Sequence, residues 1–120
     1  MTGMAVPLYQ AKAEFFRMLG HPVRIRVLEL LQDSPRPVRE LLAEIAIEPS
    51  SLSQQLAILR RHKIVMSRRE GSSVVYEIAS SDVAELLRVS RRILTELIAG
   101  QNELLAELRE PESGRTATSL

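Results

Sequence analysis

The chain has 120 residues, of which 45% are hydrophobic, 26% charged and 3% aromatic, and its formal net charge is +1. This length suits one globular domain, and the lack of cysteine excludes disulfides, thiolate metal sites and thiol redox switches. The apolar runs are too short to span a bilayer and the first residues lack signal-peptide features, so we expect a cytoplasmic protein with no membrane partner.

Four helices are predicted in the first half of the chain. Apolar side chains recur at helical spacing over residues 8–19, and a second, strongly apolar helix is expected over 22–31, where proline suits the first position. A segment rich in Pro, Ser and Asp then breaks the pattern. A short third helix over 38–45 and a fourth helix, capped by Ser50 or Ser51, are joined by a tight connection that indicates a helix-turn-helix.

The fourth predicted helix has an apolar face and a polar face. Leu52, Leu56 and Leu59 are expected to lie in the core. The remaining polar and basic residues are Ser51, Ser53, Gln54, Gln55, Arg60 and Arg61, with Lys63 just beyond the helix. An α-helix fits the major groove of duplex DNA, where Gln pairs with adenine and Arg pairs with guanine or phosphate. We therefore expect Ser53, Gln54 and Gln55 to contact bases, and the three basic residues to contact phosphate.

A β-hairpin is predicted next, because two β-prone runs, 65–69 and 74–78, flank a glycine-containing turn. Arg68 and Arg69 precede the turn, where the tip of the hairpin can approach the DNA backbone or a minor groove. Residues 49–76 contain five basic residues and one acidic residue. Such a basic segment on a near-neutral chain is typical of a compact DNA-binding protein, and the few aromatic residues favour duplex over single-stranded DNA.

A long final helix is predicted to start at residues 80–82, which can cap it, and Gly100 is expected to break or bend it. Its apolar residues form two adjacent stripes, one of Leu86, Ile93, Leu97 and Leu104 and one of Val83, Leu87, Leu94, Ile98 and Leu105. One stripe can serve the core and leave the other for a partner chain. We expect a flexible N-terminus over 1–7, one domain over 8–110 and a disordered tail over 111–120.

This order of elements predicts a mainly α fold with a small β-hairpin, the winged helix-turn-helix. Over residues 13–97 the sequence also resembles the ArsR-type winged-helix repressors. The resemblance rests on FFRMLGHPVRIRVLELL at 15–31, VRELLAEI at 38–45, SSLSQQLAILRRHKIV at 50–65 and RREGSSVVYEI at 68–78. Two positions depart from the family. Lys63 stands where a glycine often ends the recognition helix, and Gln55 stands where many relatives have histidine.

The resemblance implies a homodimer that binds double-stranded DNA and represses transcription until an effector relieves the repression. It implies a dimer interface built from the first and last helices. The candidate interface residues are Leu8, Phe15, Leu86, Ile93, Leu97 and Leu104. Because a twofold dimer presents two equivalent recognition helices about one DNA turn apart, we expect an inverted-repeat operator.

Many relatives sense metals through Cys pairs, or through Asp and His on the final helix, and these ligands are missing here. Asp82 matches the start of the final-helix pattern, but Ala84 takes the place of the second ligand, so we expect Asp82 to be a helix cap. His21 and His62 lie on different elements, so no metal site and no cofactor are predicted. A small molecule, a protein partner, methionine oxidation and the absence of any effector remain open.

Two other function classes compete with the DNA-binding hypothesis. An enzyme is disfavoured because the chain has no Cys nucleophile, no G-x-S-x-G, no P-loop and no G-x-G-x-x-G. A winged-helix module for protein-protein interaction is the stronger alternative, because a fold does not dictate its function. Such a module would not need a polar fourth helix beside a basic hairpin.

Overall fold

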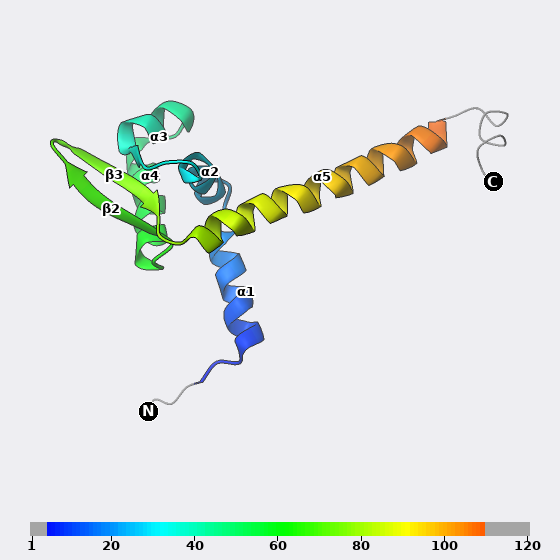
Figure 1. The fold of residues 1–120 in the computed structure, drawn as a ribbon, viewed down its shortest axis with the longest axis horizontal. Helices are drawn as coiled ribbons and strands as arrows, with labels where there is room; N and C mark the ends of the chain where they lie inside the picture. The colour runs from blue at the N-terminus through cyan, green and yellow to red at the C-terminus, as the bar shows by residue number, and fades with distance from the viewer. Residues whose placement is uncertain (1–4, 110–120) are drawn as a thin grey trace. The chain divides into compact units, whose positions relative to one another are not determined.

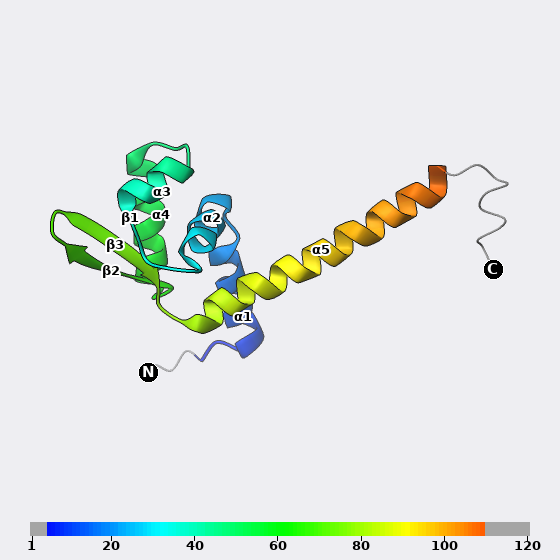
Figure 2. The same ribbon diagram turned by 45° about the horizontal axis from the view of Figure 1, so that its top comes forward.

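The computed structural model describes residues 5–109 and has the predicted order of elements with one added strand (Figures 1 and 2). The helices are α1 (Leu8–Leu19), α2 (Pro22–Leu31), α3 (Val38–Glu44), α4 (Pro49–Arg61) and α5 (Ser81–Arg109). The strands are β1 (Arg36–Pro37), β2 (Val65–Glu70) and β3 (Ser73–Ile78). The mainly α fold with a β-hairpin is therefore confirmed.

The chain divides into two compact units, and the division falls between Ala84 and Glu85, within α5. The expectation of a single domain over 8–110 stays a prediction. The tail over 111–120 and residues 1–4 lie outside the described residues, and residues 5–7 have no regular secondary structure. None of the described helices is long and apolar enough to cross a membrane.

The core of the first unit is aliphatic. Leu28 of α2, Leu41 of α3 and three leucines of α4 are almost completely buried, as is Val65 of β2. α4 contacts α2 and β2, whereas α3 contacts β1 and β3. Burying one such leucine contributes about 2 kcal/mol relative to leaving it exposed. This core therefore determines which side of each short helix faces outward.

The start of α4 differs from the prediction. Neither Ser50 nor Ser51 caps the helix, because it begins at Pro49 with Glu48 as N-cap and with no side-chain cap hydrogen bond. Proline needs no N–H partner and has a helical φ, so it suits the first position and draws both serines into the first turn.

The end of α4 is a Schellman motif. The N–H of Lys63 donates to the Arg60 carbonyl and the N–H of Ile64 donates to the Leu59 carbonyl, both at 2.9 Å. Lys63 has φ +61°, in the left-handed region that glycine adopts more easily. The departure at Lys63 noted from the sequence therefore falls on a backbone position that favours glycine.

The sheet has the order β1-β3-β2, and the short strand β1 was not predicted. β2 and β3 pair antiparallel from Val65 opposite Ile78 to Glu70 opposite Ser73, so the turn has two residues instead of the expected four. Gly71 has φ +62° in this turn. β1 is only two residues long and includes a proline, so it has no alternating pattern that a sequence could reveal.

Ser80, one of the three residues predicted to cap α5, does so, because its Oγ accepts a hydrogen bond of 3.1 Å from the N–H of Asp82. Two other expectations for this helix are wrong. Asp82 lies in the first turn and is not the cap, although its carboxylate there interacts favourably with the helix dipole. The helix runs through Gly100 without a break, because one exposed glycine costs only about 1 kcal/mol relative to alanine.

We expect Lys63→Gly to raise the free energy of unfolding by about 0.5–1 kcal/mol, because it removes the left-handed strain of a residue with a Cβ. Lys63→Ala is the matched control, since it loses the same charge and keeps the strain. Urea denaturation followed by circular dichroism, at one fixed protein concentration, measures both. Equal stability of the two variants would contradict the strain at this position.

Candidate nucleic-acid interface

The outward face of α4 is polar because its leucines face the core. Leu52, Leu56 and Leu59 are at most 1% exposed. Of the nine residues predicted to bind DNA, seven are exposed: Ser53, Gln54, Arg60, Arg61, Lys63, Arg68 and Arg69. Ser51 and Gln55 are half-buried. Of the three residues predicted to contact bases, Ser53 and Gln54 are therefore exposed, whereas Gln55 is not.

Gln55 is bonded within the protein. Its Oε1 accepts a hydrogen bond of 2.8 Å from Nε of Arg24, on α2. Nη1 of the same arginine donates to the Met18 carbonyl oxygen at 2.6 Å, in the last turn of α1. Sequence reasoning missed Arg24, because nothing in the sequence indicates that residues 31 positions apart form a pair.

Hydrogen bonds join the hairpin to the C-terminal end of α4 and to the residues that follow it. The C-terminal end of α4 connects directly to β2, and Nη1 of Arg60 donates to Oγ of Ser67 at 3.2 Å. The N–H of Ala79, just after β3, donates to the Ile64 carbonyl at 2.9 Å. The end of α4 and the hairpin are thus held together, with Arg60 partly engaged in an internal contact.

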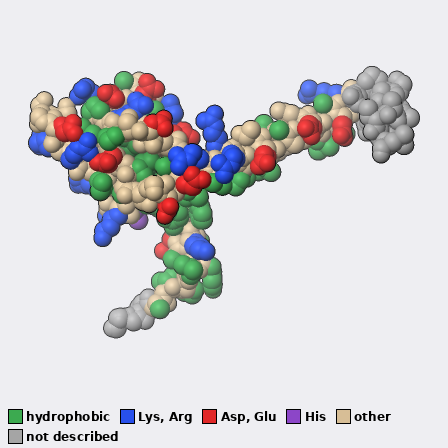
Figure 3. Space-filling model, viewed as in Figure 1, with side chains coloured by type: hydrophobic (Ala, Val, Ile, Leu, Met, Phe, Trp, Pro, Cys, Tyr) green, Lys and Arg blue, Asp and Glu red, His purple; other side chains and the backbone are tan. Residues whose placement is uncertain are grey.

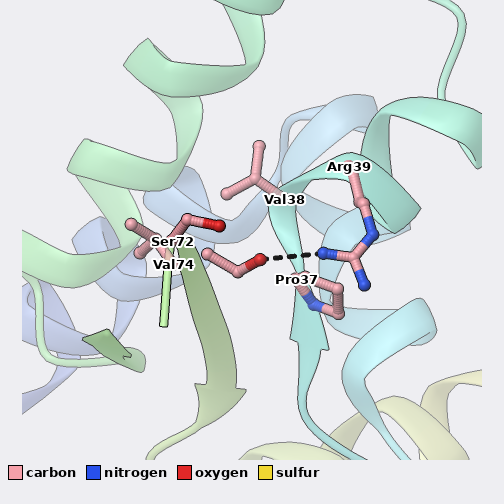
Figure 4. Close-up of a pocket in the computed structure, with 6 residues that line it drawn as sticks. Pro37, Val38, Arg39, Ser72 and Val74 are labelled. Atoms are coloured by element: carbon pink, nitrogen blue, oxygen red, sulfur yellow. Dashed lines mark hydrogen bonds between the residues drawn. The ribbon is translucent and has the colours of Figure 1, made fainter. Parts of the chain in front are cut away.

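A second attachment lies on the other side of the hairpin, at a surface hollow shown in Figure 4. The hollow is lined by Pro37, Val38, Arg39, Ser72, Ser73 and Val74. Nη1 of Arg39 donates to Oγ of Ser73 at 2.8 Å, which links α3 to the start of β3 (Figure 4). Arg39 is a basic residue near the hairpin turn that sequence reasoning missed, although its place at the start of the helix-turn-helix could have indicated it.

The two hairpin arginines have different surroundings. Nε of Arg68 lies 2.8 Å from Oε2 of Glu70, and its Nη1 pairs with Oε1 of Glu77. The hydrogen bond with Glu70, followed by the charges of Glu70 and Glu77, raises the pKa of Arg68. Arg69 has no ion pair within residues 5–109. Arg69 therefore has the less compensated charge for an incoming phosphate.

The residues predicted to form a dimer interface are mostly exposed. On α1, Leu8 is 70% exposed and Phe15 is half-buried. The more exposed neighbour Phe16 was missed; its ring packs edge-on against that of Phe15 at 5.4 Å. On α5, Leu86 is half-buried, whereas Ile93, Leu97 and Leu104 are exposed by more than half.

The two stripes of α5 do not divide as predicted. Val83 and Leu87 are buried, but Leu94, Ile98 and Leu105 of the same stripe are 46–56% exposed. From Ser90 to Arg109 every residue of α5 is exposed, and Figure 3 shows hydrophobic side chains along this part of the helix. Both stripes are therefore free beyond the first turns, which leaves a wider apolar face than the sequence suggested.

Both histidines are used locally. Nδ1 of His21 accepts a hydrogen bond of 3.1 Å from the N–H of Val23 and caps α2. Nδ1 of His62 lies 2.9 Å from the Ile58 carbonyl oxygen, at the end of α4. Over residues 5–109 there is no group of three or more His, Asp or Glu side chains that could hold a metal ion. Asp82, at the first turn of α5, belongs to no such group.

Comparisons with known proteins agree with this geometry. A family model described as a helix-turn-helix domain matches residues 19–68. The HTH-type transcriptional regulator Rv0081 of Mycobacterium tuberculosis H37Rv is 48% identical over 113 residues, which cover 93% of this chain and 96% of that protein. The crystal structure of Rv0081 has a TM-score of 0.74 at 49% identity and covers 81% of this chain and 98% of its own.

Two more distant relatives carry more specific descriptions. The transcriptional repressor SmtB homolog of Synechocystis is 36% identical over 85 residues, which cover 71% of this chain and 64% of that protein. The homodimeric winged helix-turn-helix DNA-binding domain of Mb0332 from Mycobacterium bovis, a possible ArsR-family regulator, has a TM-score of 0.69 at 27% identity. This alignment covers 82% of this chain and 94% of the Mb0332 domain.

We expect Gln54→Ala to reduce the preference for one DNA sequence over others by about 1–3 kcal/mol, because a glutamine in the major groove contacts a base edge. Fluorescence anisotropy on a preferred and a scrambled duplex measures this preference, and Gln10→Ala on α1 is the matched control. Equal losses on both duplexes for Gln54→Ala would contradict base contact.

Arg69→Ala should weaken binding to all sequences alike and lower the salt slope by about one per subunit. Fluorescence anisotropy on the same two duplexes across a salt series measures this effect, and the charge-conserving Arg69→Lys is the matched control.

Proposed function

Because the chain belongs to the ArsR-type family of winged helix-turn-helix transcriptional regulators, we propose that it represses transcription by binding an inverted-repeat operator as a homodimer. It is a DNA-binding regulator, and α4 is its recognition helix. One observation carries the proposal: α4 has an exposed polar face, with Ser53 and Gln54 near its start, while three leucines of the same helix are buried.

In this proposal the parts of the first unit have separate roles. α4 enters the major groove, and its 13 residues span about 20 Å. Ser53 and Gln54 contact base edges and supply sequence preference, whereas Arg61, Lys63 and Arg69 contact phosphates and supply affinity. The attachments of the hairpin to α3 and α4 support this arrangement, because they keep the basic tip at a constant distance from the recognition helix.

The dimer is proposed to form through the apolar residues of α1 and α5. Leu8 and Phe16 on α1, and Ile93 and Leu97 on α5, leave a large part of their side chains in water in the single chain. Burying such surface in a second copy is favourable by about 25 cal/mol per Å². The homodimeric state of the Mb0332 domain supports a homodimer of this chain, whichever helices form the interface.

A selection of bound duplexes from a random DNA library tests the proposed function. We expect an imperfect inverted repeat whose half-sites lie about one helical turn apart, because a twofold dimer presents two equivalent recognition helices. Binding to the selected duplex should be tight and should weaken steeply with salt. Unselective binding at physiological salt would contradict the proposal and favour a module that binds protein. A selected motif without twofold symmetry would contradict the twofold dimer on the operator.

We expect Leu97→Glu to shift the protein from dimer to monomer, because it places a charge in the proposed apolar interface. Ala99→Glu adds the same charge to the same helix outside both apolar stripes and should leave the dimer intact. Sedimentation velocity at micromolar concentration measures the two species. A wild-type protein that sediments only as a monomer would remove the dimer from the proposal.

A further inference from the structure

We propose that Arg24 is a positioning residue that turns the amide of Gln55 so that its NH2 group alone faces the DNA, which makes guanine the preferred base at that position. The proposal rests on the DNA-binding function proposed above. Arg24 itself need not touch DNA, since it acts through Gln55.

The guanidinium of Arg24 is held from two sides. Its Nε donates to Oε1 of Gln55 at 2.8 Å, and its Nη1 donates to the Met18 carbonyl oxygen at 2.6 Å. Arg24, Met18 and Gln55 are all half-buried, so water competes less for these bonds than at the open surface. One side chain of α2 therefore connects the last turn of α1 to the recognition helix.

This arrangement determines which end of the Gln55 amide is free. A guanidinium has only donors, so the atom facing Nε of Arg24 must be the amide oxygen. The NH2 group lies on the opposite side of the amide carbon. Within residues 5–109 no hydrogen bond joins this NH2 group to the protein. Gln55 therefore offers two donors, next to the exposed Gln54.

The free end of the amide predicts which base it contacts. A glutamine pairs with adenine by accepting from N6 and donating to N7, so it needs both ends of its amide. The oxygen of Gln55 faces Arg24, so a pairing with adenine would have to share or break this bond, which disfavours it and replaces the expectation of adenine drawn from the sequence. Guanine presents two acceptors in the major groove, O6 and N7, whereas cytosine presents a donor. We therefore expect guanine to be favoured and cytosine to be rejected.

A double-mutant cycle tests this role. The variants are Arg24→Met, Arg24→Lys, Gln55→Ala and the double variant Arg24→Met/Gln55→Ala. Arg24→Lys keeps the charge but presents a single ammonium in place of the planar fork that holds two acceptors. Arg26→Met, an exposed arginine of the same helix that pairs with Glu29 and Glu44, is the matched control. Circular dichroism verifies that each variant folds.

The readout is the base preference of each variant, measured by library selection and by anisotropy on operators with each of the four bases at the contacted position. We expect the wild type to favour guanine over cytosine by about tenfold. Arg24→Met and Arg24→Lys should both lose this preference and gain binding to adenine, because the amide becomes free to present its oxygen. In the Gln55→Ala background, Arg24→Met should change nothing further.

Nitrogen-15 NMR of the free protein provides a second readout that does not depend on DNA. The side-chain amide signal of Gln55 should shift in Arg24→Met and Arg24→Lys but not in Arg26→Met. An unchanged signal would overturn the proposal, and so would an Arg24 effect that is equal for all bases or persists without Gln55. A wild-type protein that selects no sequence at all would instead overturn the proposed function, before any variant is compared.

Discussion

Leu52, Leu56 and Leu59 face the core almost without exposure, and their burial determines the orientation of α4. A helix rolled by one residue would turn by about 100°, expose these side chains and bury the polar ones, at a cost of several kcal/mol. The outward direction of Ser53 and Gln54 is thus a consequence of hydrophobic packing. The core and the proposed DNA-binding face therefore share one helix.

Polar side-chain contacts join elements that pack around this core. Arg60 and Arg39 join the hairpin to α4 and α3, and Arg24 joins the recognition helix to α1 and α2. The Arg60 and Arg39 bonds are exposed and the Arg24 bond is half-buried, and each adds only about 1 kcal/mol to stability. They do restrict how far the hairpin and Gln55 move relative to α4, and binding to a rigid duplex depends on such preorganisation.

Basic and acidic residues are concentrated in different segments of the chain. Basic residues gather between the end of α4 and the hairpin turn, whereas α5 carries several acidic residues outside its two apolar stripes. Arg68 shows that a basic residue in the right segment is not automatically free for phosphate, because Glu70 and Glu77 already pair with it. Arg69, one residue later, has no such partner within residues 5–109.

The order of helices, the hairpin and the polar face of α4 were predictable from the amino-acid sequence, because hydrophobic periodicity and turn residues are local signals. The resemblance to the ArsR-type repressors identified Lys63 as a residue at a position where glycine is common, and its φ of +61° agrees with this. Tertiary structure decided the short strand β1, the start of α4 at Pro49 and the continuity of α5 through Gly100. It alone revealed that Arg24 bonds Gln55 and that Glu77 pairs with Arg68, because pairs between distant positions form only when the chain is folded. The exposure of most candidate DNA-binding residues was therefore predictable, but the partner of the Gln55 amide was not.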